Sequence, residues 1–313
     1  MRLIDKMRVV PIRWPCCYGS ERMNCRNFWI KGLRLASLGG LTAVAVSQAP
    51  PPAAPFATHQ LKPNTYWIEG GGGNSTVIVG TNGVVVVDAK TTKAGGQELL
   101  DDIAKITPKP VTTVILTHSD GDHVNGLAAF PADVKVIAQE NNKKEQEVAL
   151  AAGGRGAPPA DHQPTQVITK TRETLTIEGE KLELFHWAPA HTSGDLVVYL
   201  PTQKIVATGD IIATSNSYPR IHDEKHGSTE GWITTAKAMV ALDADTFIPG
   251  HGGIQTKADI QKRIADAEAR RAQVKEMVAQ GKSLDEIKAA VGDNDKLNYK
   301  SWTEVCYEEL TKR

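Results

Sequence analysis

Imidazole and carboxylate side chains are concentrated in one short segment of the sequence. Residues 118–123 read His-Ser-Asp-Gly-Asp-His and directly follow Val111–Thr117, a continuous run of apolar and β-branched residues. Such a run is typical of a buried strand, so the polar side chains are expected at the end of that strand. Histidine nitrogens and carboxylate oxygens are common ligands of divalent metals. The segment is therefore a candidate metal site.

Three later segments present similar groups beside predicted strands: Ala190–Asp195 (AHTSGD), Gly209-Asp210 and Pro249–Gly252 (PGHG). Their glycines let the backbone approach a bound group closely. Imidazoles and carboxylates presented at several strand ends are what a dinuclear metal site requires. Because no cysteine accompanies these histidines, thiolate chemistry is not expected there.

Together these segments resemble the metallo-β-lactamase-fold hydrolase superfamily, whose signature is His-x-His-x-Asp-His followed by His, Asp and His. The resemblance covers about residues 65–253 and includes GVVVVD, AHTSGD, ATGD and IPGHG in the family's order. Each stretch is a weak motif alone, whereas five in order are specific. The chain looks most similar to exported β-lactamase-like and glyoxalase II-like hydrolases. The resemblance implies an α/β (α+β) fold, a four-layer αββα sandwich with metals at its rim.

Seven residues match the metal-ligand positions of that family: His118, Asp120, Asp122, His123, His191, Asp210 and His251. The resemblance implies that His118, Asp120 and His191 hold a first metal. It gives a second metal to the other two histidines and Asp122, with Asp210 as the bridging ligand. Asp122 would also orient the attacking water, which makes it the predicted catalytic residue.

Asp120 is the one departure from the signature, because the family has its second histidine there. A carboxylate is harder than imidazole and adds a negative charge, which lowers the Lewis acidity of a bound metal. The first site would then bind its metal weakly, or accept iron or manganese more readily. The alternative role for Asp120 is a hydrogen-bond acceptor behind the ligands. Zinc, as one or two ions, is the expected cofactor, and Asp120→His is expected to raise the zinc content.

Four further histidines belong to no motif and are expected at the surface or in packing: His162, His186, His222 and His226. His226 ranks above the others because residues 213–228 follow the strand of Asp210, where the family's substrate loops lie. The loop Glu69–Asn74 (EGGGGN) occupies the position of a mobile flap in relatives, although a flexible hairpin explains its glycines equally well.

Charge is balanced over the whole chain, with 36 Lys and Arg against 36 Asp and Glu, but it is uneven along it. The first 49 residues carry eight basic and two acidic residues, which leaves 50–313 with a net charge of −6. An acidic body argues against nucleic acid as a partner. In 1–49, basic residues precede a short apolar stretch, as in a leader or signal peptide. Export to the periplasm or beyond is expected, with no stable membrane insertion after the leader is removed.

The remaining chain divides into a Pro/Ala-rich linker (50–63), the metallo-β-lactamase-like domain (64–255) and a C-terminal helical extension (256–313). Hydrophobic patterning predicts strands near 65–69, 76–79, 84–88, 111–117, 134–138, 174–177, 181–187, 196–200, 204–208 and 246–248. It predicts helices near 96–106, 140–152, 229–242, 257–280, 283–291 and 302–311. Asn82-Gly83 is a strong hairpin signal, and 153–166 is expected to be a loop.

These features predict a metal-dependent hydrolase. A metal-activated water would attack the carbonyl of a small substrate, such as a β-lactam, lactone, ester or thioester, without a serine or cysteine nucleophile. The alternative is a metal-binding or partner protein whose altered site is not hydrolytic. The sequence does not indicate an oligomeric state.

Overall fold

Two β-sheets form the centre of the computed structural model. The structure describes residues 55–153, 157–294 and 297–312, so the predicted leader lies outside the described residues. The first sheet contains, in spatial order, β1 (Ala57–Lys62), β2 (Thr65–Glu69), β3 (Ser75–Val79), β4 (Val84–Val87), β5 (Val111–Ile115), β6 (Lys135–Gln139) and β7 (Gln166–Ile168). The second contains β12 (Thr246–His251), β11 (Ile205–Ala213), β10 (Val197–Leu200), β9 (Glu180–Phe185) and β8 (Arg172–Ile177).

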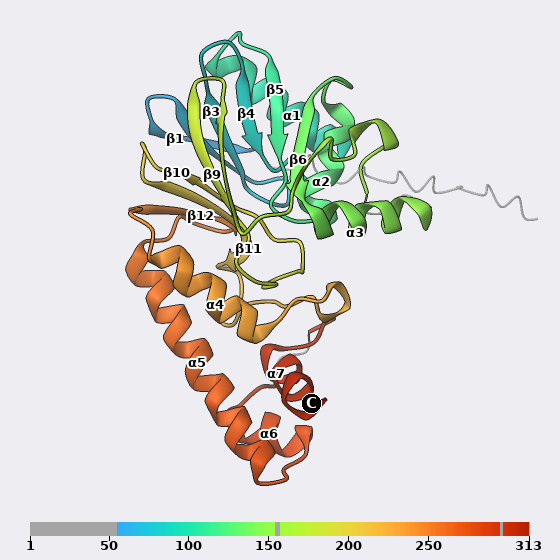
Figure 1. The fold of residues 1–313 in the computed structure, drawn as a ribbon, viewed down its shortest axis with the longest axis vertical. Coiled ribbons are helices and arrows are strands. Elements are labelled where there is room, and N and C mark those ends of the chain that lie inside the picture. The colour runs from blue at the N-terminus through green and yellow to red at the C-terminus, as the bar shows by residue number, and fades with distance from the viewer. Residues whose placement is uncertain (1–54, 154–156, 295–296, 313) are drawn as a thin grey trace, which may run out of the picture. The chain divides into compact units, whose positions relative to one another are not determined.

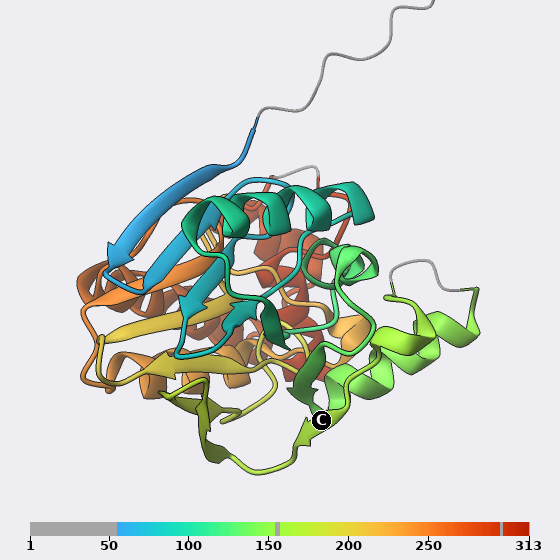
Figure 2. The same cartoon turned by 90° about the horizontal axis from the view of Figure 1, so that it is seen from above.

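The two sheets pack face to face, and helices cover both outer faces (Figures 1 and 2). The side chains of β4 explain why both faces of the first sheet are covered, because alternate side chains of a strand point to opposite faces. Val85 and Val87 pack between the sheets, whereas Val84 and Val86 pack on the outer face against α1. On the other outer face, α4 contributes Trp232 to the core. The predicted αββα sandwich is therefore confirmed.

The longer helices are α1 (Lys93–Ile106), α3 (Glu140–Ala151), α4 (Thr229–Val240), α5 (Lys257–Ala279), α6 (Leu284–Val291) and α7 (Trp302–Thr311). The short ones are α2 (Gly121–Val124) and the 3-10 turns η1 (Asn125–Ala129), η2 (Ala160–His162) and η3 (Asp223–Lys225). Capping boxes at Thr256, Ser283 and Ser301 satisfy the first amides of α5, α6 and α7. Each of these three helices consequently begins where its sequence signal predicts.

The C-terminal helices share a core with the second sheet. Phe247 of β12, Trp232 of α4 and Trp302 of α7 belong to one buried cluster. Just before α7, Lys300 Nζ lies 2.5 Å from Asp223 Oδ2, and the Tyr299 ring lies 4.4 Å from the Arg220 guanidinium. The segment that follows β11 is thus held by the end of the chain.

Several elements differ from the sequence expectations. The segment predicted as a linker includes β1, which pairs with β2; its side chains are largely exposed, so no apolar alternation marks it. Helix α1 begins three residues early because the Thr92 side chain accepts from Gly95 N and caps it. Strand β11 continues to Ala213 along β12 rather than ending at Thr208. Strand β7 lies partly in the predicted loop and was not expected.

The helices that the structure describes do not cross a membrane by the usual criteria of length and hydrophobicity. Within 55–153, 157–294 and 297–312, each helix is too short or too polar to traverse a lipid bilayer.

Candidate metal centre

The seven predicted ligands meet at one edge of the sandwich, where β4, β5 and β12 end. Residues 118–123 follow β5 and enter α2. Asp210 lies within β11, His251 is the last residue of β12, and His191 lies in the loop between β9 and β10. Because β4 runs parallel to β5 and β11 runs parallel to β12, the carboxyl ends of each pair point to the same side. The topology therefore gathers residues that are distant in sequence.

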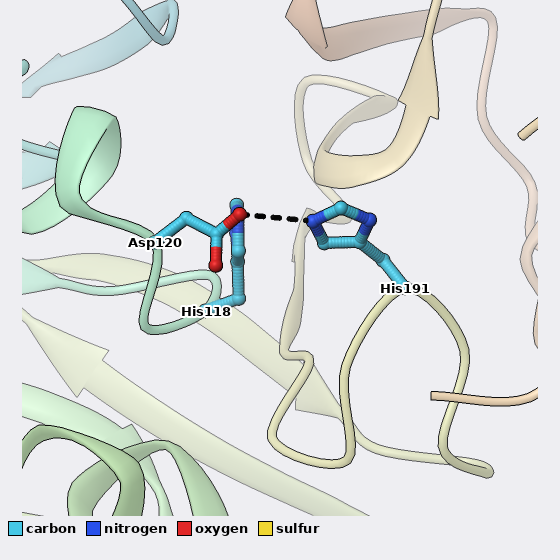
Figure 3. A group of neighbouring side chains, drawn as sticks. All are labelled: His118, Asp120 and His191. Carbon is cyan, nitrogen blue, oxygen red and sulfur yellow. Dashed lines mark hydrogen bonds and ion pairs between the residues drawn. The ribbon is translucent and has the colours of Figure 1, made fainter. Parts of the chain in front are cut away.

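The candidate ligand atoms fall into overlapping groups, each within 4.8 Å: His118–Asp120–His191, His118–His123–Asp210 and Asp122–His123–His251. We call the first group the first half of the centre and the last group the second half. In the first half, Asp120 Oδ2 lies 3.4 Å from His191 Nε2 (Figure 3). In the second half, Asp122 Oδ2 lies 3.0 Å from His251 Nε2. The structure brings all seven predicted residues together.

Asp210 lies between the two halves. Its Oδ1 is 3.2 Å from His123 Nε2, and its Oδ2 is 3.4 Å from His251 Nε2 and 3.8 Å from His191 Nε2. A carboxylate with oxygens near both groups has the position that the sequence predicts for a bridging ligand.

Hydrogen bonds at Nδ1 orient the imidazoles. His118 Nδ1 lies 2.9 Å from Thr117 Oγ1, His123 Nδ1 lies 2.8 Å from Asp88 Oδ2, and His191 Nδ1 lies 2.9 Å from the Arg220 carbonyl oxygen. These contacts leave each Nε2 toward the centre. Metal-binding histidines almost always use their second nitrogen in this way, because it fixes the tautomer and the ring orientation.

Carboxylate and imidazole charges reinforce one another here. Burial favours the neutral form of Asp120, but the imidazoles of His191 and His222 hold the pKa of Asp120 well below its usual range. Burial opposes charge on His191, yet Asp120 and Asp210 raise the pKa of His191 to about 9. Asp122 and Asp210 likewise overcome burial and raise the pKa of His251 to about 9. A metal that binds these imidazoles must displace protons, so metal affinity is expected to increase with pH.

Three buried side-chain atoms at the centre make no hydrogen bond to the described residues, although the last two lie near a side chain that could be charged: His118 Nε2, Asp210 Oδ1 and His222 Nε2. Buried polar atoms are nearly always hydrogen-bonded, so a cluster of exceptions indicates a missing partner. Nitrogen and carboxylate oxygen are both zinc ligands at short range. The residues present therefore fit one or two metal ions.

Two residues of this centre were missed by the sequence reasoning. His222, expected at the surface or in packing, is buried at the site, with Nε2 only 3.0 Å from Asp120 Oδ2. Lys225 Nζ lies 2.5 Å from the other carboxylate oxygen of Asp120. Their only sequence signal was their position in the segment after β11. The three other motif-free histidines lack such contacts: His162 is buried between Asp161 and the Phe130 carbonyl oxygen, His186 Nδ1 contacts the Asp195 carbonyl oxygen, and His226 is exposed.

Hydrogen bonds from Lys90 hold the glycine-rich loop 69–74 beside the second half of the centre. Lys90 is fully buried, and its Nζ donates hydrogen bonds to the carbonyl oxygens of Ile68, Gly70 and Gly73 at 2.8, 2.8 and 3.0 Å. A Cβ at Gly73 would lie 2.4 Å from His123 Cε1. Only glycine lets the loop pass this close to a candidate ligand.

Fold and site together define a class of protein. The sequence matches the metallo-beta-lactamase superfamily over residues 68–251, and the chain belongs to that superfamily.

Characterised relatives include several activities. The chain is 27% identical over 198 residues to the 2,4-dinitroanisole O-demethylase subunit alpha of Nocardioides sp. (strain JS1661), covering 63% of this chain and 57% of that protein. It is 24% identical to the linear primary-alkylsulfatase of Pseudomonas sp. (strain ATCC 19151), covering 56% of this chain and 40% of that one. It is 28% identical to metallo-beta-lactamase IND-1 of Chryseobacterium indologenes, and the alignment covers 63% of this chain and 86% of that protein. The chain thus spans about half the length of the first two relatives.

Solved structures show the same fold. The inverting sec-alkylsulfatase Pisa1 from Pseudomonas sp. aligns with a TM-score of 0.65 at 20% identity, covering 82% of this chain and 50% of that one. The metallo-beta-lactamase from Pontibacter korlensis aligns with a TM-score of 0.57 at 20% identity, covering 68% and 99%.

Proposed function

We propose that this protein is a metal-dependent hydrolase of small molecules, with zinc as its metal. The observation that carries the proposal is the convergence of seven ligand-type residues on a centre where His118 Nε2 and Asp210 Oδ1 are buried without partners. Metallo-beta-lactamases and an alkylsulfatase, both hydrolytic enzymes, are among the chain's relatives.

When bound, zinc supplies Lewis acidity and makes a water molecule more acidic. The chain's own contribution begins with Asp122, whose side chain is the most accessible of the candidate carboxylates, at 35% exposure. Burial raises the pKa of Asp122, but His251 and His123 outweigh it and lower that pKa to about 2. Asp122 therefore stays ionised at neutral pH, where it can accept a hydrogen bond from a water molecule and orient it. His123 is held in place by Asp88, behind the reacting atoms.

A cavity of about 500 Å³ supports a small substrate. Its lining includes two apolar side chains of α3, two cations and two carboxylates: Val148, Ala149, Lys144, Lys225, Glu145 and Glu224. Lys225 also contacts Asp120, so this cavity borders the metal centre. The apolar side chains suit a small molecule with an apolar body, and the charges of both signs do not select for an anion. A β-lactam, lactone, ester or thioester fits the predicted carbonyl chemistry, and an alkyl sulfate is the substrate class named for one relative.

Export remains part of the proposal, on the strength of the leader-like residues 1–49. Intact-mass measurement of protein produced with its leader should show loss of the leader. A product that retains it in full would count against export.

Metal analysis and a hydrolysis panel test the function. The full-length protein should bind one or two zinc ions and cleave at least one of a chromogenic β-lactam, a lactone, an aryl ester, a thioester and an alkyl sulfate. Asp122→Asn should abolish turnover and weaken binding of the second metal, and His162→Ala should change neither. A zinc-loaded protein that cleaves none of these would favour the alternative, a metal-binding or partner protein without hydrolytic activity.

A further inference from the structure

A third imidazole faces the first half of the metal centre, beside those of His118 and His191. His222 precedes the short turn η3, and its Nε2 lies 3.0 Å from Asp120 Oδ2. The same oxygen lies 3.4 Å from His191 Nε2 and 3.8 Å from His118 Nε2. Zinc bonds of 2.0–2.1 Å in a tetrahedron place neighbouring ligand atoms about 3.4 Å apart. Three imidazole nitrogens thus lie 3.0–3.8 Å from one carboxylate oxygen, close to that spacing.

The orientation of His222 matches that of the predicted ligands. Its Nδ1 is hydrogen-bonded to a carboxylate oxygen of Glu224, and its ring meets that of His191 edge-on, with centroids 4.7 Å apart. Its Nε2 is buried and, although close to Asp120, has no hydrogen-bond partner among the described residues. A carboxylate at one ring nitrogen and a free second nitrogen is the usual arrangement of a metal-binding histidine.

Lys225 compensates the negative charge that Asp120 introduces. Its Nζ lies 2.5 Å from Asp120 Oδ1 and 2.9 Å from Ser119 Oγ. One oxygen of Asp120 is thus occupied by an ammonium group, and the other faces the imidazoles. Asp120 and Lys225 together carry no net charge, as would the neutral histidine that the family places there.

We propose that His222 is a ligand of the first metal and supplies the imidazole that the aspartate at position 120 removes from the signature, while Lys225 neutralises that aspartate. The first half then offers three imidazoles and a charge-compensated carboxylate, rather than a weakened site. This inference rests on the proposed function only in requiring that the centre bind metal.

Cobalt(II) loading of the full-length protein tests the assignment with a signal that does not depend on turnover. His222→Cys should place a thiolate on the first metal and produce a sulfur-to-cobalt charge-transfer absorption in the near ultraviolet. The absorption is measured as the difference from wild type, which carries the buried Cys306 and three cysteines in residues 1–49. His162→Cys is the matched control, because it makes the same substitution at a buried histidine with both nitrogens already partnered.

Zinc binding gives the second measurement. His222→Ala should lower the affinity for one zinc ion by about 100-fold or more, since even residues behind the ligands contribute 10–100-fold. Circular dichroism of the metal-free variants checks folding, and if His222→Ala is unfolded, the His222→Cys spectrum decides. Retention of both zinc ions by His222→Ala, or no absorption from a metal-loaded His222→Cys, overturns the inference and leaves the proposed function intact. A wild type that binds no metal overturns both.

Discussion

The two halves of the metal centre are built from different kinds of structure. The second half comes from a strand end and a short helix, and it retains the family's residues: Asp122, His123 and His251. The first half keeps His118 and His191 but has Asp120 in place of an imidazole, and it draws His222 and Lys225 from a connecting segment. When one signature residue is substituted, residues that are close in space but belong to no linear motif can thus supply the missing ligand and charge.

The halves also differ in exposure. In the first half, the side chains of His118 and His191 are each 1% exposed and that of Asp120 is 13% exposed. In the second half, His251 and Asp122 reach 27% and 35%. We therefore expect substrate to approach the second half, while the first half acts as the more enclosed metal site.

Removal of a second-half histidine should have the largest effect. His251→Ala takes away an imidazole within 3.0 Å of Asp122 and 3.4 Å of Asp210. Affinity for one zinc ion and the rate of hydrolysis should each fall by more than about 100-fold. His162→Ala, measured by the same zinc titration and assays, should match wild type. Equal losses in the two variants would reject the assignment of His251.

Asp120→His separates the sequence interpretation from the structural one. The signature alone predicts that restoring histidine raises zinc occupancy. The structure predicts the reverse, because the new ring would meet the Lys225 ammonium and the His222 imidazole with no carboxylate to pair them. Affinity for the first zinc should fall about 10-fold, by analogy with the loss of a residue that supports ligands.

The matched double variant sharpens this test. Adding Lys225→Met to Asp120→His removes the unpaired ammonium, so part of the lost affinity should return. A gain of zinc by the single variant, measured by titration against a chelator, would contradict the structural interpretation.

Asp88→Asn probes the support behind the second half. Asp88 accepts hydrogen bonds from Thr117 N and Oγ1 at 2.8 and 2.7 Å and contacts His123 Nδ1 at 2.8 Å. An amide has one acceptor oxygen instead of two, so His123 should lose its orientation. Zinc affinity at the second half should drop about 10–100-fold, with a smaller loss at the first half, because His118 reaches Asp88 only through Thr117 Oγ1. Equal weakening of both sites in a two-site titration would show that the halves are not independently supported.

Lys90 gives a prediction about stability rather than metal binding, and it depends on pH. Burial outweighs the nearby carboxylates, of which Asp88 has the largest influence, and lowers the pKa of Lys90 from 10.5 to about 7. Between these values the unfolded chain binds more protons, so the free energy of unfolding should rise with pH from 7 to 10.5. The slope from one group is at most about 1.4 kcal/mol per pH unit.

Lys90→Met is the comparison for that measurement. Denaturant unfolding of both proteins across this pH range should show the extra slope in wild type alone. Parallel curves would mean that the three carbonyl acceptors keep the ammonium protonated, because a neutral amine has only two N–H groups to donate.

Much of the fold could be predicted from local patterns. The β-branched run at 111–115, the Asn82-Gly83 hairpin and the helix Trp302–Thr311 each carry a strong signal, and each is present. Strand β1 lacked such a signal because it is an edge strand with largely exposed side chains, held by pairing with β2. Its position is decided by tertiary contact rather than by periodicity.

The residues of the candidate site also divide into those that local patterns reveal and those that only tertiary contacts place. His118, His123, His191 and His251 could be found because strand ends and fixed spacings mark them. His222 could not, because nothing in residues 213–228 distinguishes it from His226, and only the path of the chain after β11 turns one histidine inward.

The contacts of Tyr299 and Lys300 with the segment after β11 bear on how this protein can change over evolution. The match to the superfamily stops at residue 251, yet Tyr299 and Lys300 hold Arg220 and Asp223, which flank His222 closely in sequence. Arg220 in turn offers its carbonyl oxygen to His191. If recombination replaced the C-terminal helical extension by that of a relative, the contacts that position His191 and His222 would change as well. The extension and the metal centre are therefore expected to be inherited together.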